Sequence, residues 1–370
     1  MKVDRQQVLA YRSRAQGLLR EATSVGDLAI LDLGVQEAMG QPAASAFDAR
    51  LAKTPPEDVF GPGKRLALVW SLRGAPHVHR RKDLNALAKA LYPLSEADAI
   101  GRLNETGPSV AKAGIAGLEQ FELAIEAMAG EITAPTAKGA ASSAVTKRLP
   151  DVMARDCRPC KARHISDSAM RSTALIAGLE LQPGTAPPVL QPRSRATRPK
   201  APDGKALRAQ IEAYLRLLGP ATSREVADYL GIRRADLEQF WPDDLVEVDV
   251  DGARAYIPAS AAQELKRAKP VELVRLLGGF DPFLQARDRN LIVPDKAAQK
   301  ALWPVLGRPG ALLVDGDIVG AWRPKTSGKK LTLSVEAFGA LPASVWKKVE
   351  EEAERVAAYR GASAVAVAQV

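Results

Sequence analysis

The chain has 370 residues, of which 46% are hydrophobic and 26% are charged, and its formal net charge is +9. This composition is typical of a folded globular protein of two to four modules and excludes a largely disordered chain. No apolar run reaches the about 18 residues that span a bilayer, and the first residues lack a signal-peptide core, so we expect a cytoplasmic protein without a membrane partner. The excess of Lys and Arg favours a polyanionic partner, because both displace counterions condensed on phosphates.

The first segment, residues 1–95, is predicted to form an N-terminal winged-helix-like domain. Helical apolar patterns cover residues 4–20, 26–33 and 43–52, and extended segments follow at 66–73 and 77–80. Three helices followed by two strands are the order of elements in a winged helix, so this segment is predicted to contact nucleic acid.

Residues 96–181 repeat this order less clearly and are interpreted as a second, degenerate winged-helix-like domain. Helices are predicted from Leu118, over residues 138–147 and after Pro150, and an apolar stretch follows at 172–181. Residues 182–203 are rich in Pro and Arg. Because proline disfavours both helices and sheet ladders, this segment is predicted to be an extended linker.

Residues 204–260 carry the clearest winged-helix pattern. Apolar residues recur at helical spacing from Leu207 to Leu218, and Thr222 with Glu225 forms a capping box at the start of a second helix. A third, short helix is predicted from Arg233 to Trp241.

A hairpin follows these three helices. Its strands at 246–250 and 253–257 alternate apolar and polar residues on either side of Asp251-Gly252. A type I′ turn needs positive φ at both central residues, and Asp-Gly is one of the pairs that adopt it readily. The hairpin is predicted to be the wing of a module that contacts DNA or RNA, although such units also serve as packing modules.

Residues 261–345 are predicted to form a small antiparallel β domain. Its strands are expected at 312–314, 318–322 and 331–335, with a tight turn at 315–317. Residues 346–370 are predicted to be a C-terminal helix and tail, and the mixed Lys and Glu residues of that helix indicate a solvated face. The predicted fold is therefore a helix-rich α+β protein of tandem winged-helix domains with a small C-terminal antiparallel β domain.

Four sequence motifs resemble those of the winged-helix DNA glycosylases of the AlkZ and YcaQ type. They are LDLGVQ at residues 31–36, WSLRGAPHVH at 70–79, GFDPFLQARDR at 279–289 and PGALLVDGDIVGAWRPK at 309–325. The resemblance spans most of the chain and implies a series of winged helices with a small β-rich domain, bent into a cleft around duplex DNA. It also implies a DNA-repair enzyme that hydrolyses the N-glycosidic bond of alkylated purines.

The catalytic motif of that family is a Gln, an apolar residue and then Gln or Asp. This chain has Gln36, Glu37 and Ala38 at the corresponding position. The chemistry needs a group that orients water at C1′, and negative charge or a dipole that stabilises an oxocarbenium-like transition state. The resemblance assigns Gln36 and Glu37 as candidate catalytic residues. Because Ala38 replaces the second acceptor, two interpretations stay open: a glycosylase, or a non-catalytic regulator or architectural protein that binds DNA.

The expected partner is duplex DNA, contacted by basic side chains and two histidines. The candidates are Arg73, His77, His79, Arg233, Arg234, Arg254, Arg287 and Arg289. His77 and His79 are two residues apart on a predicted strand and so face the same side, where they either approach DNA or pack as ordinary histidines. Arg287 and Arg289 either pair with neighbouring aspartates to fix their loop or reach DNA.

Cys157, Cys160 and His164 have the spacing of metal ligands, but a zinc site needs a fourth ligand and the chain has no second Cys-x-x-Cys. Both cysteines are therefore predicted to be reduced, metal-free thiols, and neither a metal nor another cofactor is expected. The motifs of nucleotide-driven motors, dinucleotide enzymes, zinc proteases and serine hydrolases do not occur in a suitable context. We expect a monomer.

Overall fold

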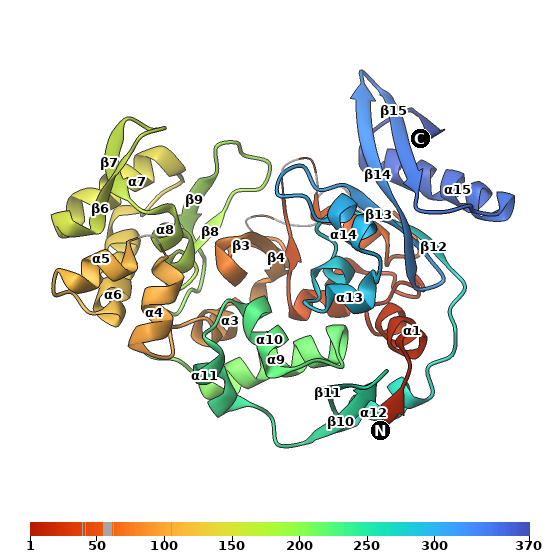
Figure 1. The fold of residues 1–370 in the computed structure, drawn as a ribbon. Coiled ribbons are helices and arrows are strands. Elements are labelled where there is room, and N and C mark those ends of the chain that lie inside the picture. The colour runs from red at the N-terminus through yellow and green to blue at the C-terminus, as the bar shows by residue number, and fades with distance from the viewer. Residues whose placement is uncertain (39, 41, 55–60, 62, 105) are drawn as a thin grey trace. The chain divides into compact units, whose positions relative to one another are not determined.

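The structure is a computed structural model that describes residues 1–370 except 39, 41, 55–60, 62 and 105 (Figure 1). Contacts divide the chain into two compact units, each discontinuous in sequence. The first comprises Met1–Val59, Glu212–Glu225 and Asp243–Val370, and the second comprises Phe60–Ile211 and Val226–Pro242. The predicted boundaries after residues 95, 181 and 203 do not coincide with the edges of these units. None of the described helices has the length and apolar character that a membrane span requires.

In the first unit, the N-terminal helix α1 (Arg5–Ala15) packs beside a hairpin from much later in the sequence. Asp4 and Gln7 form a capping box at its start, and Gly17, at a φ of 75°, follows its end. The helix is therefore shorter than the predicted 4–20. Strand β1 (Lys2–Val3) runs parallel to β10 (Leu245–Val250), which pairs with β11 (Ala253–Pro258). Apolar residues of α1, this sheet and α12 (Ala259–Lys266) form one core.

The C-terminal sheet of the first unit has the order β12, β13, β14, β15, β16 (Figure 1). These strands are Val274–Leu277, Gly310–Val314, Asp317–Ser327, Lys330–Ala337 and Ala364–Gln369. The first four are antiparallel; β13, β14 and β15 were predicted, and β12 was missed. Strand β16 lies in the predicted tail and pairs parallel to β15. Helix α15 (Ala343–Tyr359) packs Val349, Ala353, Val356 and Ala357 into the core of this sheet.

Both predicted tight turns are present. Asp251 and Gly252 have φ values of 48° and 91°, and Asp315 and Gly316 have φ values of 51° and 94°. All four residues thus occupy the positive-φ region that a type I′ turn requires. The two Asp-Gly pairs fix the registers of the hairpins β10–β11 and β13–β14.

The remaining elements of the first unit are short. They are η1 (Val25–Asp27), η2 (Ala29–Asp32), β2 (Val35–Gln36), α2 (Ala43–Asp48), η7 (Pro282–Gln285), α13 (Arg289–Ile292) and α14 (Lys296–Leu302). The predicted helix over 26–33 is thus wrong in type, because the segment forms two 3₁₀ turns. Leu28 separates them with a ψ of 122°, an extended conformation that interrupts a continuous helix.

The second unit contains a sheet in which β4, β3, β8, β9 and β5 are neighbours in that order. The strands are Pro76–Arg80, Leu66–Trp70, Leu179–Leu181, Val189–Pro192 and Thr136–Ala137. Strand β9 lies within the segment predicted to be a linker without sheet ladders, and that prediction is wrong. Its Leu190 is fully buried, and β9 pairs antiparallel with both β8 and β5. The only proline of β9 is Pro192, at its end, where a missing N–H disrupts pairing least.

Helices form the rest of the second unit. They are α3 (Leu84–Ala90), α4 (Glu96–Leu103), α5 (Gly107–Lys112), α6 (Gly117–Glu131), α7 (Lys138–Arg148) and α8 (Asp167–Thr173). Helix α6 contacts α4, α5, α7 and α8, and its buried Phe121, Ile125 and Met128 were predicted to mark its apolar face. The helix predicted after Pro150 forms only as the single 3₁₀ turn η5 (Asp151–Met153). The hairpin of β6 (Ala154–Cys157) and β7 (Ala162–Ile165) follows this turn.

The elements predicted over residues 204–260 all form, in the predicted order. They are α9 (Gly204–Leu218), α10 (Ser223–Leu230), α11 (Arg234–Leu237), η6 (Glu238–Phe240) and the hairpin β10–β11. The capping box is confirmed, because Glu225 N donates to Thr222 Oγ1 over 3.3 Å and Thr222 N donates to Glu225 Oε2 over 2.7 Å. Their assembly into one of several tandem winged helices stays a prediction.

Candidate functional site

The segment that ends in Gln36 and Glu37 is held by buried apolar residues on its N-terminal side. Leu31, Leu33 and Val35 are each at most 1% exposed. Gln36 is the last residue of β2, and both it and Glu37 are partly exposed. The chain therefore anchors this segment by its apolar side chains and leaves two polar side chains accessible in part.

Glu37 turns toward the start of α2. Its Oε2 accepts a hydrogen bond from the backbone N–H of Ala43, the first residue of that helix, over 2.7 Å. Burial raises the pKa of the Glu37 carboxyl, and the hydrogen bond from Ala43 opposes that rise. Glu37 is thus a polar residue that accepts a hydrogen bond from a helix N-terminus and also holds its proton more strongly than an exposed glutamate.

An ion pair immediately after α2 fixes the helix from its other end. Arg50 and Asp281 form two hydrogen bonds of 2.7 and 2.8 Å, and both side chains are fully buried. Arg50 Nε also donates to Gln16 O over 2.8 Å. Removing one partner of such a buried pair typically costs about 3–5 kcal/mol, because the other charge is left uncompensated. The position of α2, and with it the partner of Glu37, is therefore strongly determined.

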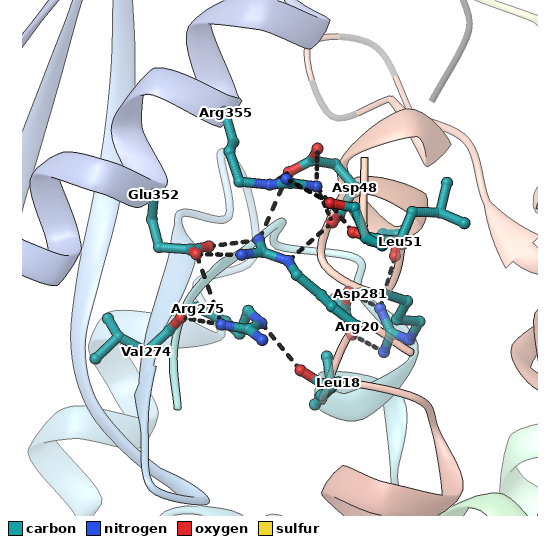
Figure 2. A network of polar contacts seen from close by, with 12 residues as sticks. Leu18, Arg20, Asp48, Leu51, Val274, Arg275, Asp281, Glu352 and Arg355 are labelled. Atoms are coloured by element: carbon teal, nitrogen blue, oxygen red, sulfur yellow. Dashed lines mark hydrogen bonds and ion pairs between the residues drawn. The ribbon is translucent and has the colours of Figure 1, made fainter. Parts of the chain in front are cut away.

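A second network ties α2 to α15 (Figure 2). Arg20 binds Glu352 through two hydrogen bonds of 2.5 and 2.7 Å, and Arg355 contacts the Asp48 carboxylate at 2.9 Å. Glu352 is 7% exposed, so the prediction of a solvated face on this helix is wrong at that residue. Arg275 also contacts Glu352 at 3.6 Å, and burial lowers the pKa of its guanidinium to about 10. These residues hold the framework of the first unit.

Three of the predicted DNA contacts, Arg254, Arg287 and Arg289, line one groove in the first unit. The hairpin β10–β11 contributes Arg254, and the segment at the start of α13 contributes the other two. Arg254 is exposed and forms a surface ion pair with Glu247 at 3.4 Å, an interaction that is weak and easily exchanged. The groove thus combines the predicted wing with the family-like motif of residues 279–289.

The aspartates nearest in sequence to Arg287 and Arg289 pair with other arginines. Asp288 binds Arg12 through hydrogen bonds of 2.5 and 3.0 Å, and Asp281 binds Arg50, so the predicted pairing of these aspartates with Arg287 and Arg289 is wrong. Burial, and then the charge of Arg287, lower the pKa of Arg289.

Arg308 belongs to the same group of arginines, since burial and then the charges of Arg289 and Arg287 lower its pKa. Sequence reasoning missed Arg308, although it stands directly before the motif that begins at Pro309. It also missed the buried Arg12 and Arg50, because nothing in their spacing distinguishes them from surface arginines.

The remaining arginine candidates lie in the second unit. Arg233 and Arg234 are exposed on and beside α11, where they pair with Asp236 at 3.8 Å and Glu238 at 2.8 Å. Arg73 is exposed with a φ of 54°, donates to the carbonyl of Tyr229 and lies 4.9 Å from the centre of the Tyr229 ring. These three residues belong to the second unit, whereas the residues that line the groove belong to the first.

The side chains of His77 and His79 are buried. His77 and His79 are 2% and 3% exposed, and both contact Ser71 Oγ, at 3.1 and 3.0 Å. They do face the same side of β4, as their spacing predicted. Burial lowers the pKa of His79 to about 3, and burial and the neighbouring His79 lower that of His77. Buried neutral imidazoles attract no phosphate, so the burial of His77 and His79 argues against the prediction that they contact DNA.

Cys157, Cys160 and His164 form the one group of potential metal ligands found among the described residues. Their ligand atoms all lie within 4.8 Å of one another on the hairpin β6–β7. Both cysteines are free thiols. The backbone N–H of Cys160, and then its side chain, hydrogen-bond Cys157 and lower the pKa of the Cys157 thiol.

Comparisons with known proteins agree with the motifs above. A family model described as DNA glycosylase AlkZ-like matches residues 32–359. A curated relative from Streptomyces sahachiroi, named interstrand DNA cross-link repair glycosylase, is 32% identical over 167 residues, which are 42% of this chain and 43% of the relative. That match thus spans less than half of the relative. The solved structure of Streptomyces sahachiroi DNA glycosylase AlkZ has a TM-score of 0.76 and 24% identity over 100% of both chains, which establishes a shared fold.

Proposed function

Because the chain belongs to the AlkZ-like DNA glycosylase family, we propose that it is a DNA-repair glycosylase that binds duplex DNA and hydrolyses the N-glycosidic bond of alkylated purines. The observation that carries the proposal is the placement of Gln36 and Glu37, two adjacent and partly exposed polar residues on a rigid framework. The curated relative is named for the repair of interstrand DNA cross-links, and we include such cross-links in the proposed substrate class.

The reaction requires little acid catalysis when the purine is alkylated at N7 or N3. Such a base carries a positive charge and leaves as a neutral molecule when the bond from C1′ to its ring nitrogen breaks. Water then bonds to C1′ and loses a proton. Gln36 can orient that water through its amide, and Glu37 in its ionised form can accept the proton and stabilise the positive charge that develops on the sugar.

The groove lined by Arg254, Arg287 and Arg289 supports the binding half of this proposal. Phosphate contacts position a protein on duplex DNA without reading its sequence, and arginine suits them because it presents a fork of N–H donors. A repair enzyme needs this kind of contact, since lesions occur in every sequence context.

A second candidate function is DNA binding without hydrolysis. Two features favour it: Ala38 replaces the second acceptor of the family motif, and the Glu37 carboxyl already accepts a hydrogen bond from Ala43. In that case the chain would be a regulator or architectural protein that retains the fold of a glycosylase.

The test uses duplex DNA that carries an N7-alkylated guanine. Abasic sites are measured by alkaline strand cleavage in single-turnover reactions, and DNA affinity is measured in parallel. We expect wild-type protein to release the base above the spontaneous rate. Gln36→Ala and Glu37→Gln should each reduce the rate by on the order of 10²–10³, because each removes one group of a preorganised site. Affinity should stay almost unchanged, since neither residue carries a positive charge.

The matched control is Gln239→Ala, which removes an exposed glutamine remote in sequence from the motif. It should retain the wild-type rate. Binding of duplex DNA by the wild type without base release would refute the glycosylase proposal and establish the second candidate. Equal rates in the wild type and both motif variants would place the active site elsewhere.

A further inference from the structure

The hairpin β6–β7 gathers three soft metal ligands on one face. In its antiparallel register, Cys157 lies opposite Ala162, and Arg155 lies opposite His164. Alternate residues of a strand face the same side, so Cys157 and His164 share a face as diagonal neighbours. Cys160 lies in the turn that joins the two strands, three residues after Cys157. The turn folds its thiol back, and all three ligand atoms lie within 4.8 Å of one another.

The imidazole of His164 is oriented as a ligand. Its Nδ1 lies 2.6 Å from the carbonyl oxygen of Ile165. A carbonyl can only accept, so Nδ1 carries the proton and Nε2 is left with the free lone pair. Metal-binding histidines usually show this arrangement, in which one ring nitrogen donates to a carbonyl or carboxylate and the other binds the ion.

We propose that Cys157, Cys160 and His164 form a zinc-binding site that clamps the hairpin β6–β7. Two thiolates and one neutral imidazole are typical zinc ligands. Bond lengths of about 2.3 Å to sulfur and 2.0–2.1 Å to nitrogen, in a tetrahedron, place ligand atoms about 3.4–3.8 Å apart. The observed separations are at most 4.8 Å, so side-chain movements of about an ångström suffice to close the site. Three protein ligands leave the fourth position to water or to a donor from outside the chain.

This proposal replaces the prediction of metal-free thiols made from the sequence. That prediction rested on the lack of a fourth protein ligand, whereas zinc held by three protein ligands can complete its tetrahedron with a water molecule. The sequence pattern also did not reveal that the two cysteines and the histidine belong to a hairpin, because the segment after Pro150 was predicted to be a helix.

A bound metal ion would add stability to the hairpin β6–β7. Its two strands form a separate sheet of four residue pairs, and its far face carries the exposed Asp156 and Arg163. A two-stranded hairpin without further packing is marginally stable in water. Here β7 packs against α7, but the turn that carries Cys160 is exposed. A metal ion that links the turn to β7 would bind the folded hairpin in preference to the unfolded one, and so would stabilise it and hold its register. The role inferred is structural and does not depend on the proposed glycosylase activity.

The experiment uses the full chain, purified under reducing conditions without chelator. Metal content is measured by elemental analysis, and thiols are counted with a chromogenic disulfide reagent. The chain has two cysteines, so the thiol count reports on this site alone. We expect about one zinc per chain and slow thiol reaction, with both thiols becoming reactive when a strong chelator removes the metal. Cobalt added to the metal-free protein should give the intense near-ultraviolet band of thiolate ligation.

Variants separate ligation from folding. Cys160→Ser and His164→Gln should each lose stoichiometric zinc, and cobalt bound to Cys160→Ser should show a weaker thiolate band. Arg158→Ala, an exposed change in the same turn that keeps all three ligands, should retain the metal. Circular dichroism of every variant reports whether the chain is folded. Wild-type protein with two freely reactive thiols and no bound zinc or cobalt would overturn the proposal, as would a disulfide between the cysteines in reducing buffer.

Discussion

Glu37 illustrates how one side chain links the stability of the first unit to its proposed chemistry. The carboxyl accepts the Ala43 N–H at the start of α2, which suits a negative charge because helix N-termini are partly positive. Burial acts in the opposite direction and raises its pKa from the ordinary value of 4.5. Since burial is the larger effect, the ionised form that a catalytic base requires exists in the folded protein at some cost in stability.

The substitution Glu37→Gln tests that cost. The pKa of Glu37 is 4.5 in the unfolded chain and higher in the folded chain, so between these two pKa values the folded chain binds more protons. The contribution of Glu37 to stability therefore falls as the pH rises from the unfolded-state pKa through the folded-state pKa. Gln keeps an oxygen for the Ala43 N–H but cannot ionise. We expect the variant to have a larger free energy of unfolding than the wild type at neutral pH, with the difference vanishing below pH 4.5. Urea titrations across this range measure it. A difference that grows as the pH falls would contradict the assignment.

At the scale of elements, the wing hairpin β10–β11 depends on its Asp-Gly turn. Gly252 has a φ of 91°, and a Cβ added there would meet no atom within 4 Å. Gly252→Ala therefore acts through backbone strain alone, and we expect a loss of about 1–2 kcal/mol in the free energy of unfolding. Gly139→Ala in α7 is the matched control, because it also has open space but no positive φ. It should be neutral or stabilising by up to about 1 kcal/mol. Equal effects of the two variants would show that the turn imposes no strain.

Elements with strong local signals could be predicted from the sequence. The two Asp-Gly turns, the Thr222 capping box and the apolar face of α6 all form as predicted, since each depends on residues close together in the chain. Elements stabilised by distant partners were missed. Strand β9 exists because β8 and β5 flank it, and β16 exists because β15 offers a free edge.

Some features of the candidate site could likewise be predicted from the sequence, and others could not. A family-like motif located Gln36 and Glu37, and charge located the three arginines of the groove. The partner of Glu37 could not be predicted, because it is a backbone N–H at the start of a helix six residues later in the chain. The burial of His77 and His79 could not be predicted either. Alternation along β4 shows that the two side chains share a side of the strand, but it does not show whether that side faces solvent.

At the scale of the whole molecule, the net charge of +9 predicts that affinity for DNA depends on salt. Each phosphate that the protein neutralises contributes about 0.9 to the slope of log K against log salt concentration. If Arg254, Arg287 and Arg289 each contact one phosphate, replacing all three with alanine lowers that slope by up to about 2.7, which is three times 0.9. Fluorescence anisotropy of a labelled duplex at several salt concentrations measures the slope.

Two comparison variants show whether the groove or the general charge is responsible. The double variant Lys347→Ala, Lys348→Ala removes two exposed charges from α15, and neither residue lines the groove. It should leave the slope of log K against log salt concentration unchanged. Arg233→Ala with Arg234→Ala tests the α11 pair, which would lower the slope by up to about 1.8 if both contact phosphates. A triple groove variant with the wild-type slope would mean that the groove does not contact the DNA backbone, and a reduced slope in the α11 pair would then place the DNA on the second unit.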